Sequence, residues 1–270
     1  MNPPAVPFAV PFAGVALVTG AAKRLGREIA LALARTGWDI AVHYRQSGTQ
    51  AAAVAQEIRG LGRRADTFAA DLSDPKAASA LLDRVTEAMG AVNGLINSAS
   101  HFELDQPQTF SADQFEQHQR PNLTAPLLLS RRLYELVTAR RDTATNEPAV
   151  IINLLDQKLD NLNPDFFSYT LTKAGLLAAT RMMAIAFAPQ IRVNGVSPGA
   201  TLKSWSQSEQ GFDEANRIAL LDRSSTPGDI AQAVVYLAGA RAITGVNLIV
   251  DGGQHLMPLD RDVMFLTKKL

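Results

Sequence analysis

The amino-acid sequence predicts an α/β protein with one doubly wound parallel sheet and helices on both faces. Three observations lead to this prediction. Short runs of β-branched and aliphatic residues alternate with longer amphipathic stretches, the pattern of strands and helices that follow one another. No linker, repeat or change of composition divides that alternation. Apolar residues make up 47% of the 270 residues and charged residues 19%, so the chain can bury a large core.

The expected strands are short and almost wholly apolar, as in parallel sheets that are covered on both faces. Turn residues or an amphipathic stretch bound each of them. In chain order they are Val15–Thr19, Ile40–Tyr44, Ala65–Ala70, Gly94–Asn97, Ala149–Leu154, Ile191–Val196 and Asn247–Val250.

The expected helices are the amphipathic stretches between these strands. In chain order they are Arg27–Thr36, Thr49–Leu61, Pro75–Met89, Ala112–Arg140, Ser168–Phe187 and Asp229–Ala238. Gly37 and Gly90 stand where two of them end, as expected for residues that leave the helical conformation easily. Pro121 and Pro126 interrupt the fourth stretch, whose helical pattern continues on both sides of them.

Composition and charge exclude several classes of protein. Lys and Arg together number 26, as do Asp and Glu, so no net charge attracts nucleic acid or an anionic membrane. The chain has no cysteine, which excludes disulfides, a thiolate nucleophile and thiolate metal sites. Its four histidines lie far apart without ligand spacing, and no metal site is expected.

The first residues differ from the rest of the chain. Residues 1–13 are rich in proline and lack the basic start and unbroken apolar run of a secretory signal, so we expect a flexible arm. Residues 14–270 form the expected single domain, with a C-terminal tail that reaches a neighbouring subunit or stays mobile. No window reaches the roughly 18 uncharged apolar residues of a membrane span. We therefore expect a cytoplasmic protein with no membrane contact.

The first strand is followed by a turn that suits a phosphate group. Its residues are Thr19, Gly20, Ala21, Ala22, Lys23, Arg24, Leu25 and Gly26. Glycines there let the backbone approach a pyrophosphate, which then lies at the positive end of the following helix. The glycines follow a Gly-x-x-x-Gly-x-Gly spacing in which Arg24 takes the middle position. A plain turn between a strand and a helix remains the alternative. With the fold, this turn predicts a Rossmann-type dinucleotide site.

The end of the second strand predicts which dinucleotide binds. Enzymes that use NAD usually place an acid there, roughly 20 residues after the glycines, to hold the ribose hydroxyls. Here the strand ends at His43 and Tyr44, followed by Arg45 and Ser47, with no acid. Arg45 and Ser47 can donate hydrogen bonds to the 2′-phosphate of NADP. Alternatively, Arg45 only caps a strand end that is exposed to solvent. The sequence therefore predicts NADP(H).

Polar residues follow the third and fourth expected strands, where the carboxyl ends of strands form a ligand crevice. Asp71 and Leu72 follow the third strand and are expected to hold the adenine edge, unless Asp71 only caps the next turn. The residues expected to contact the cofactor after the fourth strand are Asn97, Ser98, Ala99 and Ser100.

Tyr169 and Lys173 lie four residues apart on an expected helix, which puts the phenol and the ammonium on one face. An undisturbed tyrosine titrates near pH 10 and is a poor acid at neutrality. A nearby cation favours the phenolate, so we expect Lys173 to lower the pKa of Tyr169 toward neutrality.

These motifs, with Asn122, Ser197-Pro198-Gly199 and Asp251-Gly252-Gly253, make the chain resemble the short-chain dehydrogenase/reductase family from its first strand to its last. The resemblance implies that Tyr169 is the general acid and that Lys173 is its electrostatic partner and a ligand of the nicotinamide ribose. It further implies that Asn122 supports the proton path and that Pro198 and Gly199 flank the nicotinamide. Homotetramers are common in the family, and Ala112–Arg140 and Ser168–Phe187 carry suitable apolar faces.

One departure from the family pattern points to a narrower group. Asp156 stands where the family usually has a serine, and a carboxyl group can exchange a proton with a heterocycle nitrogen. Together with Arg24 and with Phe102, it resembles the pteridine reductases, which sandwich a pterin between the nicotinamide and an aromatic ring. That resemblance implies that Phe102 stacks on the pterin, that Ser100 and Arg24 bind it, and that Asp156 and Tyr169 supply the proton.

The sequence therefore predicts an NADPH-dependent reductase of a dihydropterin, biopterin or dihydrofolate. Phe102 as a core aromatic residue and Asp156 as a strand-end cap remain alternatives. At the level of function, a general carbonyl or 3-oxoacyl reductase would use the same Tyr169 and Lys173. A protein that binds NADP(H) without catalysis is the third hypothesis.

Overall fold

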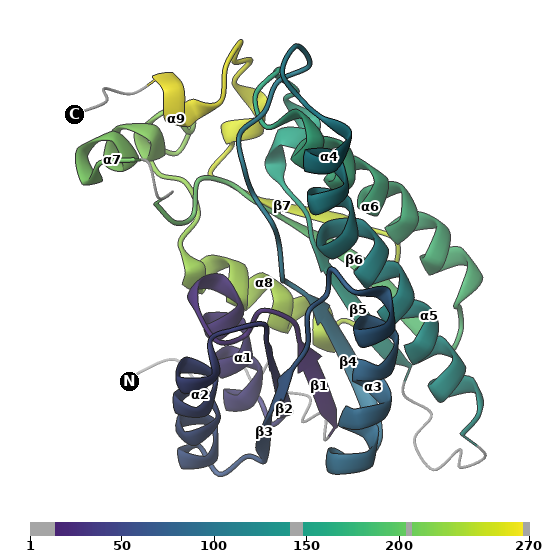
Figure 1. Ribbon diagram of the computed structural model, residues 1–270. Coiled ribbons are helices and arrows are strands. Elements are labelled where there is room, and N and C mark those ends of the chain that lie inside the picture. Colours follow the sequence, from purple (N-terminus) through teal and green to yellow (C-terminus); the bar gives the residue numbers. More distant parts are fainter. Residues whose placement is uncertain (1–13, 141–147, 204–206, 267–270) are drawn as a thin grey trace, which may run out of the picture.

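The computed structural model describes residues 14–140, 148–203 and 207–266. In these ranges one parallel sheet of seven strands lies between two layers of helices (Figure 1). The predicted fold class is thereby confirmed. The expected arm over residues 1–13 and the tip of the tail, residues 267–270, lie outside the described residues.

The sheet is doubly wound, with the strand order β3-β2-β1-β4-β5-β6-β7. Its strands are β1 (Val15–Val18), β2 (Asp39–Tyr44), β3 (Ala65–Ala69), β4 (Val92–Asn97), β5 (Ala149–Leu154), β6 (Ile191–Pro198) and β7 (Asn247–Val250). Every neighbouring pair is parallel. The chain reverses its direction of winding between β1 and β4, the point where such sheets open a crevice for ligands.

Helices cover both faces of the sheet (Figure 1). One face packs against α1 (Arg24–Arg35), α2 (Gly48–Gly60) and α8 (Pro227–Gly239). The other packs against α3 (Pro75–Met89), α5 (Ala125–Thr138) and α6 (Phe167–Ala186), beside which lies α4 (Ala112–Gln119). The central strands β1 and β5 are buried along their whole length, which explains why β1 is apolar throughout and β5 is apolar at every position except Asn153.

Several elements differ from the expectation. Helix α1 begins at Arg24 rather than Arg27, because the turn after β1 ends before the last glycine of the motif. The expected helical stretch Ala112–Arg140 is divided by a π-helical turn, η1 (Arg120–Thr124). Pro121 lies within that turn, where the wider backbone accommodates a residue without an N–H group.

The sequence analysis missed the short elements near the carboxyl edge of the sheet. These are the 3-10 turns η2 (Gln157–Asp160) and η3 (Gln254–Leu256) and the helices α7 (Glu209–Arg217) and α9 (Val263–Leu266). Each has at most nine residues, fewer than the window over which an apolar period is recognised. None of the helices in the described residues is both long and apolar enough to cross a bilayer.

His43 fastens the turn after β1 to the sheet. Its Nδ1 accepts a hydrogen bond from the backbone N–H of Gly20 at 3.0 Å, and its Nε2 lies 3.1 Å from the carbonyl oxygen of Ala70. The ring therefore carries its proton on Nε2 and is neutral. Burial lowers the pKa of His43 from 6.5 to about 4.

We predict that folding loses stability as the pH falls from 6.5 toward 4. The folded state disfavours the charged ring, so the contribution of His43 is complete above pH 6.5 and is lost as the unfolded chain takes up the proton. The full loss amounts to about 3 kcal/mol. Urea unfolding at pH 7 and at pH 5 should detect about 2 kcal/mol of it, because the remainder is lost only as the pH falls further toward 4. In His43→Asn, which has no group titrating there, this pH dependence should shrink; an unchanged dependence would contradict the assignment.

Candidate active site

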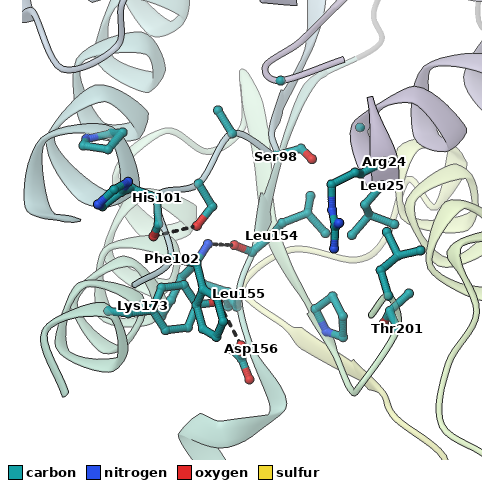
Figure 2. A pocket seen from close by; sticks show the side chains of 18 of the residues that line it. Arg24, Leu25, Ser98, His101, Phe102, Leu154, Leu155, Asp156, Lys173 and Thr201 are labelled. Atoms are coloured by element: carbon teal, nitrogen blue, oxygen red, sulfur yellow. Dashed lines mark hydrogen bonds between the residues drawn. The ribbon is translucent and has the colours of Figure 1, made fainter. Parts of the chain in front are cut away.

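A cavity of about 580 Å³ lies at the carboxyl ends of the strands. Figure 2 shows Arg24, Leu25 and Thr201 across this cavity from Phe102 and Asp156. Most of the site residues predicted from the sequence line it. These are Gly20, Lys23, Arg24, Leu25, Gly26, His43, Arg45, Asp71, Leu72, Ser98, Ala99, Ser100, Phe102, Asp156, Tyr169, Lys173, Pro198 and Gly199.

Four predicted residues lie outside the cavity wall: Tyr44, Ser47, Asn97 and Asn122. Tyr44 packs against the start of α2, and Ser47 is the residue before that helix. The buried Asn97 donates a hydrogen bond from Nδ2 to Oδ1 of Asn153 at 2.8 Å, which links β4 to β5. Its side chain therefore joins two strands inside the sheet.

Residues from the C-terminal third of the chain complete the wall, and the sequence analysis missed them. They include Ala200, Gln207, Phe212, Gln254, Asp262, Val263 and Met264. Loops and short elements carry most of them, and no motif in the sequence distinguishes them. Residues 204–206, which include Trp205, lie outside the described residues.

The glycines of the turn after β1 allow neighbouring backbone segments to lie close to it. Gly20 has φ +67°, and a Cβ there would lie 3.1 Å from the Cα of Ala99. A Cβ on Gly26 would lie 2.4 Å from the carbonyl oxygen of Gly20, so α1 packs directly on the turn. Arg24 takes the left-handed conformation, with φ +52°, at the position where the motif has a glycine. The backbone thus keeps the glycine conformation while it gains a guanidinium group.

Positive charge gathers at this end of the cavity. Lys23, Arg24 and Arg45 line the wall, and α1 begins there without an acidic residue in its first turn. Free N–H groups at a helix start attract anions. Asp71 also lines the wall, but its Oδ1 accepts from the backbone N–H of Ser73 at 2.8 Å, so it caps its own turn. The glycine cradle and the three cations fit a dinucleotide phosphate.

Asp156 and Tyr169 form a hydrogen-bonded pair at the other end of the cavity. Asp156 follows β5 and Tyr169 lies in the first turn of α6; the phenol donates to Oδ2 of Asp156 at 2.8 Å. Burial raises the pKa of Asp156, against its hydrogen bonds from Lys158 and Tyr169. Burial, followed by the charge of Asp156, raises the pKa of Tyr169 well above its usual range. The carboxyl group, rather than the phenol, therefore titrates closer to neutral pH.

The predicted effect of Lys173 on Tyr169 is wrong for this structure. Lys173 Nζ lies 5.6 Å from the centre of the Tyr169 ring and donates to the carbonyl oxygen of Leu154 at 2.6 Å. Burial lowers the pKa of Lys173 to about 8. The residue spacing in the sequence predicted an ammonium group beside the phenol, but it did not predict that a carboxylate would contact the phenol. Burial and that carboxylate outweigh the cation, so the pKa of Tyr169 rises.

Asn122 connects the loop after β4 to α6. Its Nδ2 donates to the carbonyl oxygen of His101 at 2.9 Å and to Oγ1 of Thr172 at 3.3 Å. Its Oδ1 accepts from the backbone N–H of His101 at 2.7 Å and from Oγ of Ser100 at 3.3 Å. Asn122 is buried and lies in the π-helical turn η1. It therefore fixes the loop that carries Phe102 relative to the helix that carries Tyr169.

Phe102 belongs to an aromatic wall rather than to an isolated lid. Its ring stacks on Phe166 with centroids 4.2 Å apart and an interplanar angle of 17°. It meets Tyr169 edge-on, with centroids 4.7 Å apart and an angle of 84°. Phe166 has φ +56° and immediately precedes α6. The loop residues before this helix thus provide an aromatic partner that the sequence analysis did not identify.

The chain is similar to known oxidoreductases along most of its length. A family model described as enoyl-(acyl carrier protein) reductase matches residues 20–255. Pteridine reductase 1 of Leishmania tarentolae is 31% identical over 91% of this chain and 98% of its own length. The 3-oxoacyl-(acyl-carrier-protein) reductase FabG of Staphylococcus aureus is 30% identical over 89% and 98%. The structure of FolM alternative dihydrofolate reductase 1 from Brucella canis, complexed with NADP, matches with a TM-score of 0.83 and 32% identity over 92% and 96%.

Proposed function

The chain belongs to the short-chain dehydrogenase/reductase family, and on that premise we propose that it is an NADPH-dependent reductase of a pterin-type substrate. Dihydropterins, biopterin and dihydrofolate are the proposed class. One observation carries the proposal: a carboxyl group, Asp156, is hydrogen-bonded to the phenol of Tyr169 at 2.8 Å and lines the cavity with it.

The dinucleotide site supports NADP(H) as the cofactor. The glycine turn and the start of α1 would hold its phosphates, and Arg45 would hold the 2′-phosphate. Lys173, Pro198 and Gly199 would lie at the nicotinamide end. The structure of the Brucella canis relative contains NADP. When bound, the reduced cofactor supplies the hydride.

The chemistry of Asp156 and Tyr169 favours a ring nitrogen as the proton acceptor. When Asp156 is protonated, its carboxyl group donates to the phenol oxygen, and the phenol O–H is free to donate to the substrate. Tyr169 then gives its proton to the substrate nitrogen and takes the one from Asp156, so a new N–H bond replaces the O–H bond of the acid. Burial raises the pKa of Asp156 and thereby helps that proton to stay on the acid. A carboxylate beside a developing alkoxide, by contrast, is unfavourable.

The aromatic wall supports a flat substrate. Phe102 lines the cavity and already makes a stacked contact with Phe166, an arrangement that holds its ring in place. Ser100 and Arg24 line the same cavity and would bind the polar edge of a pterin. Phe102, Phe166 and Ser100 lie in loops or turns, and Arg24 lies at the start of α1. The sheet and its helices position all four side chains.

A carbonyl or 3-oxoacyl reductase is the second candidate. The similarity to FabG of Staphylococcus aureus and the Tyr169 and Lys173 pair favour it. Asp156 favours the first candidate, because its carboxyl group can exchange a proton with a ring nitrogen, whereas its ionised form opposes the negative charge that develops on a ketone oxygen. Turnover of ketones but not of pterins would select this second function.

We predict that Tyr169→Phe lowers kcat for a dihydropterin about 10²–10⁴-fold, the usual contribution of a general acid. Asp156→Asn should lower it at least about tenfold and remove the fall in rate at rising pH that follows the loss of the Asp156 proton. NADPH oxidation, followed across the pH range, measures both. Asp160→Asn, an exposed acid on η2, is the matched control and should retain full activity. Full activity in Asp156→Asn would remove the reason to prefer pterins.

We predict that the protein binds NADPH more tightly than NADH and that Arg45→Ala reduces this preference. Loss of a charge-assisted hydrogen bond costs about 1.5–3 kcal/mol, which is roughly 10–100-fold in affinity. Fluorescence titration with both dinucleotides measures the ratio, and Arg35→Ala, exposed at the far end of α1, is the control. Equal affinity of the unmodified protein for the two dinucleotides would refute the assignment of Arg45.

We also propose that the protein acts in the cytoplasm as a homotetramer. Helix α6 exposes an apolar stripe whose members include Leu171, Met182 and Ile185, with 45%, 70% and 82% of each residue exposed. Spacings of 11 and 14 residues place them on one face of the helix. A face of this kind is suited to a second copy of the chain.

The oligomer proposal has a direct test. Light scattering should give four times the chain mass of 29.0 kDa, and Ile185→Asp should reduce the measured mass because it places a charge in the apolar contact. A single-chain mass for the unmodified protein would contradict the proposal. Asp213→Asn, a polar change outside α6, should leave the mass unchanged.

A further inference from the structure

The segment after β7 returns across the carboxyl edge of the sheet and forms part of the cavity wall. Asp262, Val263 and Met264 line the cavity together with Asp156 and Tyr169. In Figure 1 this segment ends in α9, which lies beside α7. The catalytic pair proposed above is therefore enclosed in part by residues 262–264, which lie beyond the last of the family motifs, Asp251-Gly252-Gly253.

Polar contacts hold this segment against the loop that precedes α6. The fully buried Asp165 accepts from Nε of Arg261 and from the backbone N–H of Asp262, both at 2.8 Å. Asn161 donates from Nδ2 to the carbonyl oxygen of Met257. Phe265 lies 6.1 Å from Phe166, centroid to centroid, in a stacked orientation. The segment is thus tied to the same loop that supports the aromatic wall.

Lys158 connects the two acidic groups of the cavity. Its backbone N–H donates to Oδ1 of Asp156 at 2.9 Å, and its Nζ donates to Oδ2 of Asp262 at 3.0 Å. Lys158 is 3% exposed, so this ion pair is well shielded from water. Asp262 keeps a fixed place as well, because its own backbone N–H is bound by Asp165. A displacement of Asp156 or of Asp262 is therefore passed to the other acid through one residue, Lys158.

We propose that Asp262 is a positioning residue for the proton donor: held by Lys158, it fixes the C-terminal segment beside Asp156 and adds a second negative charge to the surroundings of the Asp156–Tyr169 pair. The inference deepens the proposed function, on which its catalytic meaning rests. Asp262 is assigned no contact with the substrate and no proton to transfer.

The charges around Asp156 come from three elements. Lys158 on η2 and Lys173 on α6 are cationic, Tyr169 on α6 donates its hydrogen bond, and Asp262 from the C-terminal segment is anionic. The charge of Asp262 raises the pKa of Asp156 and of Tyr169, whereas Lys158 lowers that of Asp156. Asp262 thus helps to retain the proton that the reaction consumes.

The test measures the protonation of Asp156 without substrate. Infrared difference spectra recorded across a pH titration detect the carbonyl stretch of a protonated carboxyl group, and the band of Asp156 is the one absent from Asp156→Asn. In Asp262→Asn we expect the pKa of Asp156 to fall by roughly half a unit to one unit, since a negative charge is lost and Lys158 is left uncompensated. In Lys158→Gln we expect it to rise, because the carboxylate of Asp262 remains.

Two matched variants separate the effect of the charge of Asp262 from the effect of a loosened C-terminal segment. Arg261→Gln breaks the contact with Asp165 and loosens the same segment but leaves the charges next to Asp156 in place. Asp260→Asn removes an exposed acid two residues from Asp262. Both should leave the pKa of Asp156 unchanged. The proposal is overturned if Asp262→Asn leaves that pKa unchanged, if Lys158→Gln shifts it in the same direction as Asp262→Asn, or if Arg261→Gln shifts it as much as Asp262→Asn does.

Activity measurements distinguish a failure of this inference from a failure of the proposed function. If opposite shifts of the Asp156 pKa are found and no pterin is reduced, the positioning role stands and the assigned substrate is wrong. If pterins are reduced and the shifts are absent, the function stands and the role of Asp262 is refuted. With both correct, the pH at which kcat declines moves down in Asp262→Asn and up in Lys158→Gln.

Discussion

The hydrogen bond between the phenol of Tyr169 and Oδ2 of Asp156 is the interaction on which the rest of the site depends. It joins the end of β5 to the first turn of α6, 13 residues further along the chain. Because both groups are removed from bulk water, neither holds its proton with ordinary affinity. In the proposed function the pair acts as one proton donor, in which the carboxyl group sets the pH range and the phenol faces the reaction.

The surrounding structure serves to keep that pair in place and to divide the cavity by charge. Asn122 fixes the loop of Phe102 against α6, and Lys173 is bound to the carbonyl oxygen of Leu154 at the end of β5. The cations of the dinucleotide end lie on one side of the cavity, and the carboxylates of Asp156 and Asp262 lie on the other. In the proposed function the cations would hold the cofactor phosphates, and the reacting ring of the substrate would lie beside Asp156 and Tyr169.

The fold could be predicted from the sequence because parallel strands that are buried on both faces, such as β1 and β5, are short and almost wholly apolar. Local motifs were predictable because a local constraint dictates their residues. Gly20 and Gly26 are required where two backbone segments approach closely. Tyr169 and Lys173 share one face of a helix because they are four residues apart.

Contacts between distant segments could not be predicted in this way. The sequence indicated Asp156 as an unusual residue but not that Tyr169 donates to it, so the direction of the Tyr169 pKa was wrong. Asn97 has the pattern of a cofactor ligand, yet its side chain joins β4 to β5. Asp262 lies 106 residues after Asp156 in a short polar segment, and only the folded chain brings it to Lys158.

The most direct measurement is a crystal structure of the protein with NADP and a dihydropterin. The account predicts that the bicyclic ring stacks between the nicotinamide and Phe102, with a ring nitrogen within hydrogen-bonding distance of the Tyr169 phenol while Asp156 remains bound to that phenol. A ring that lies elsewhere, or a Tyr169–Asp156 pair that faces away from every ring nitrogen, would contradict it.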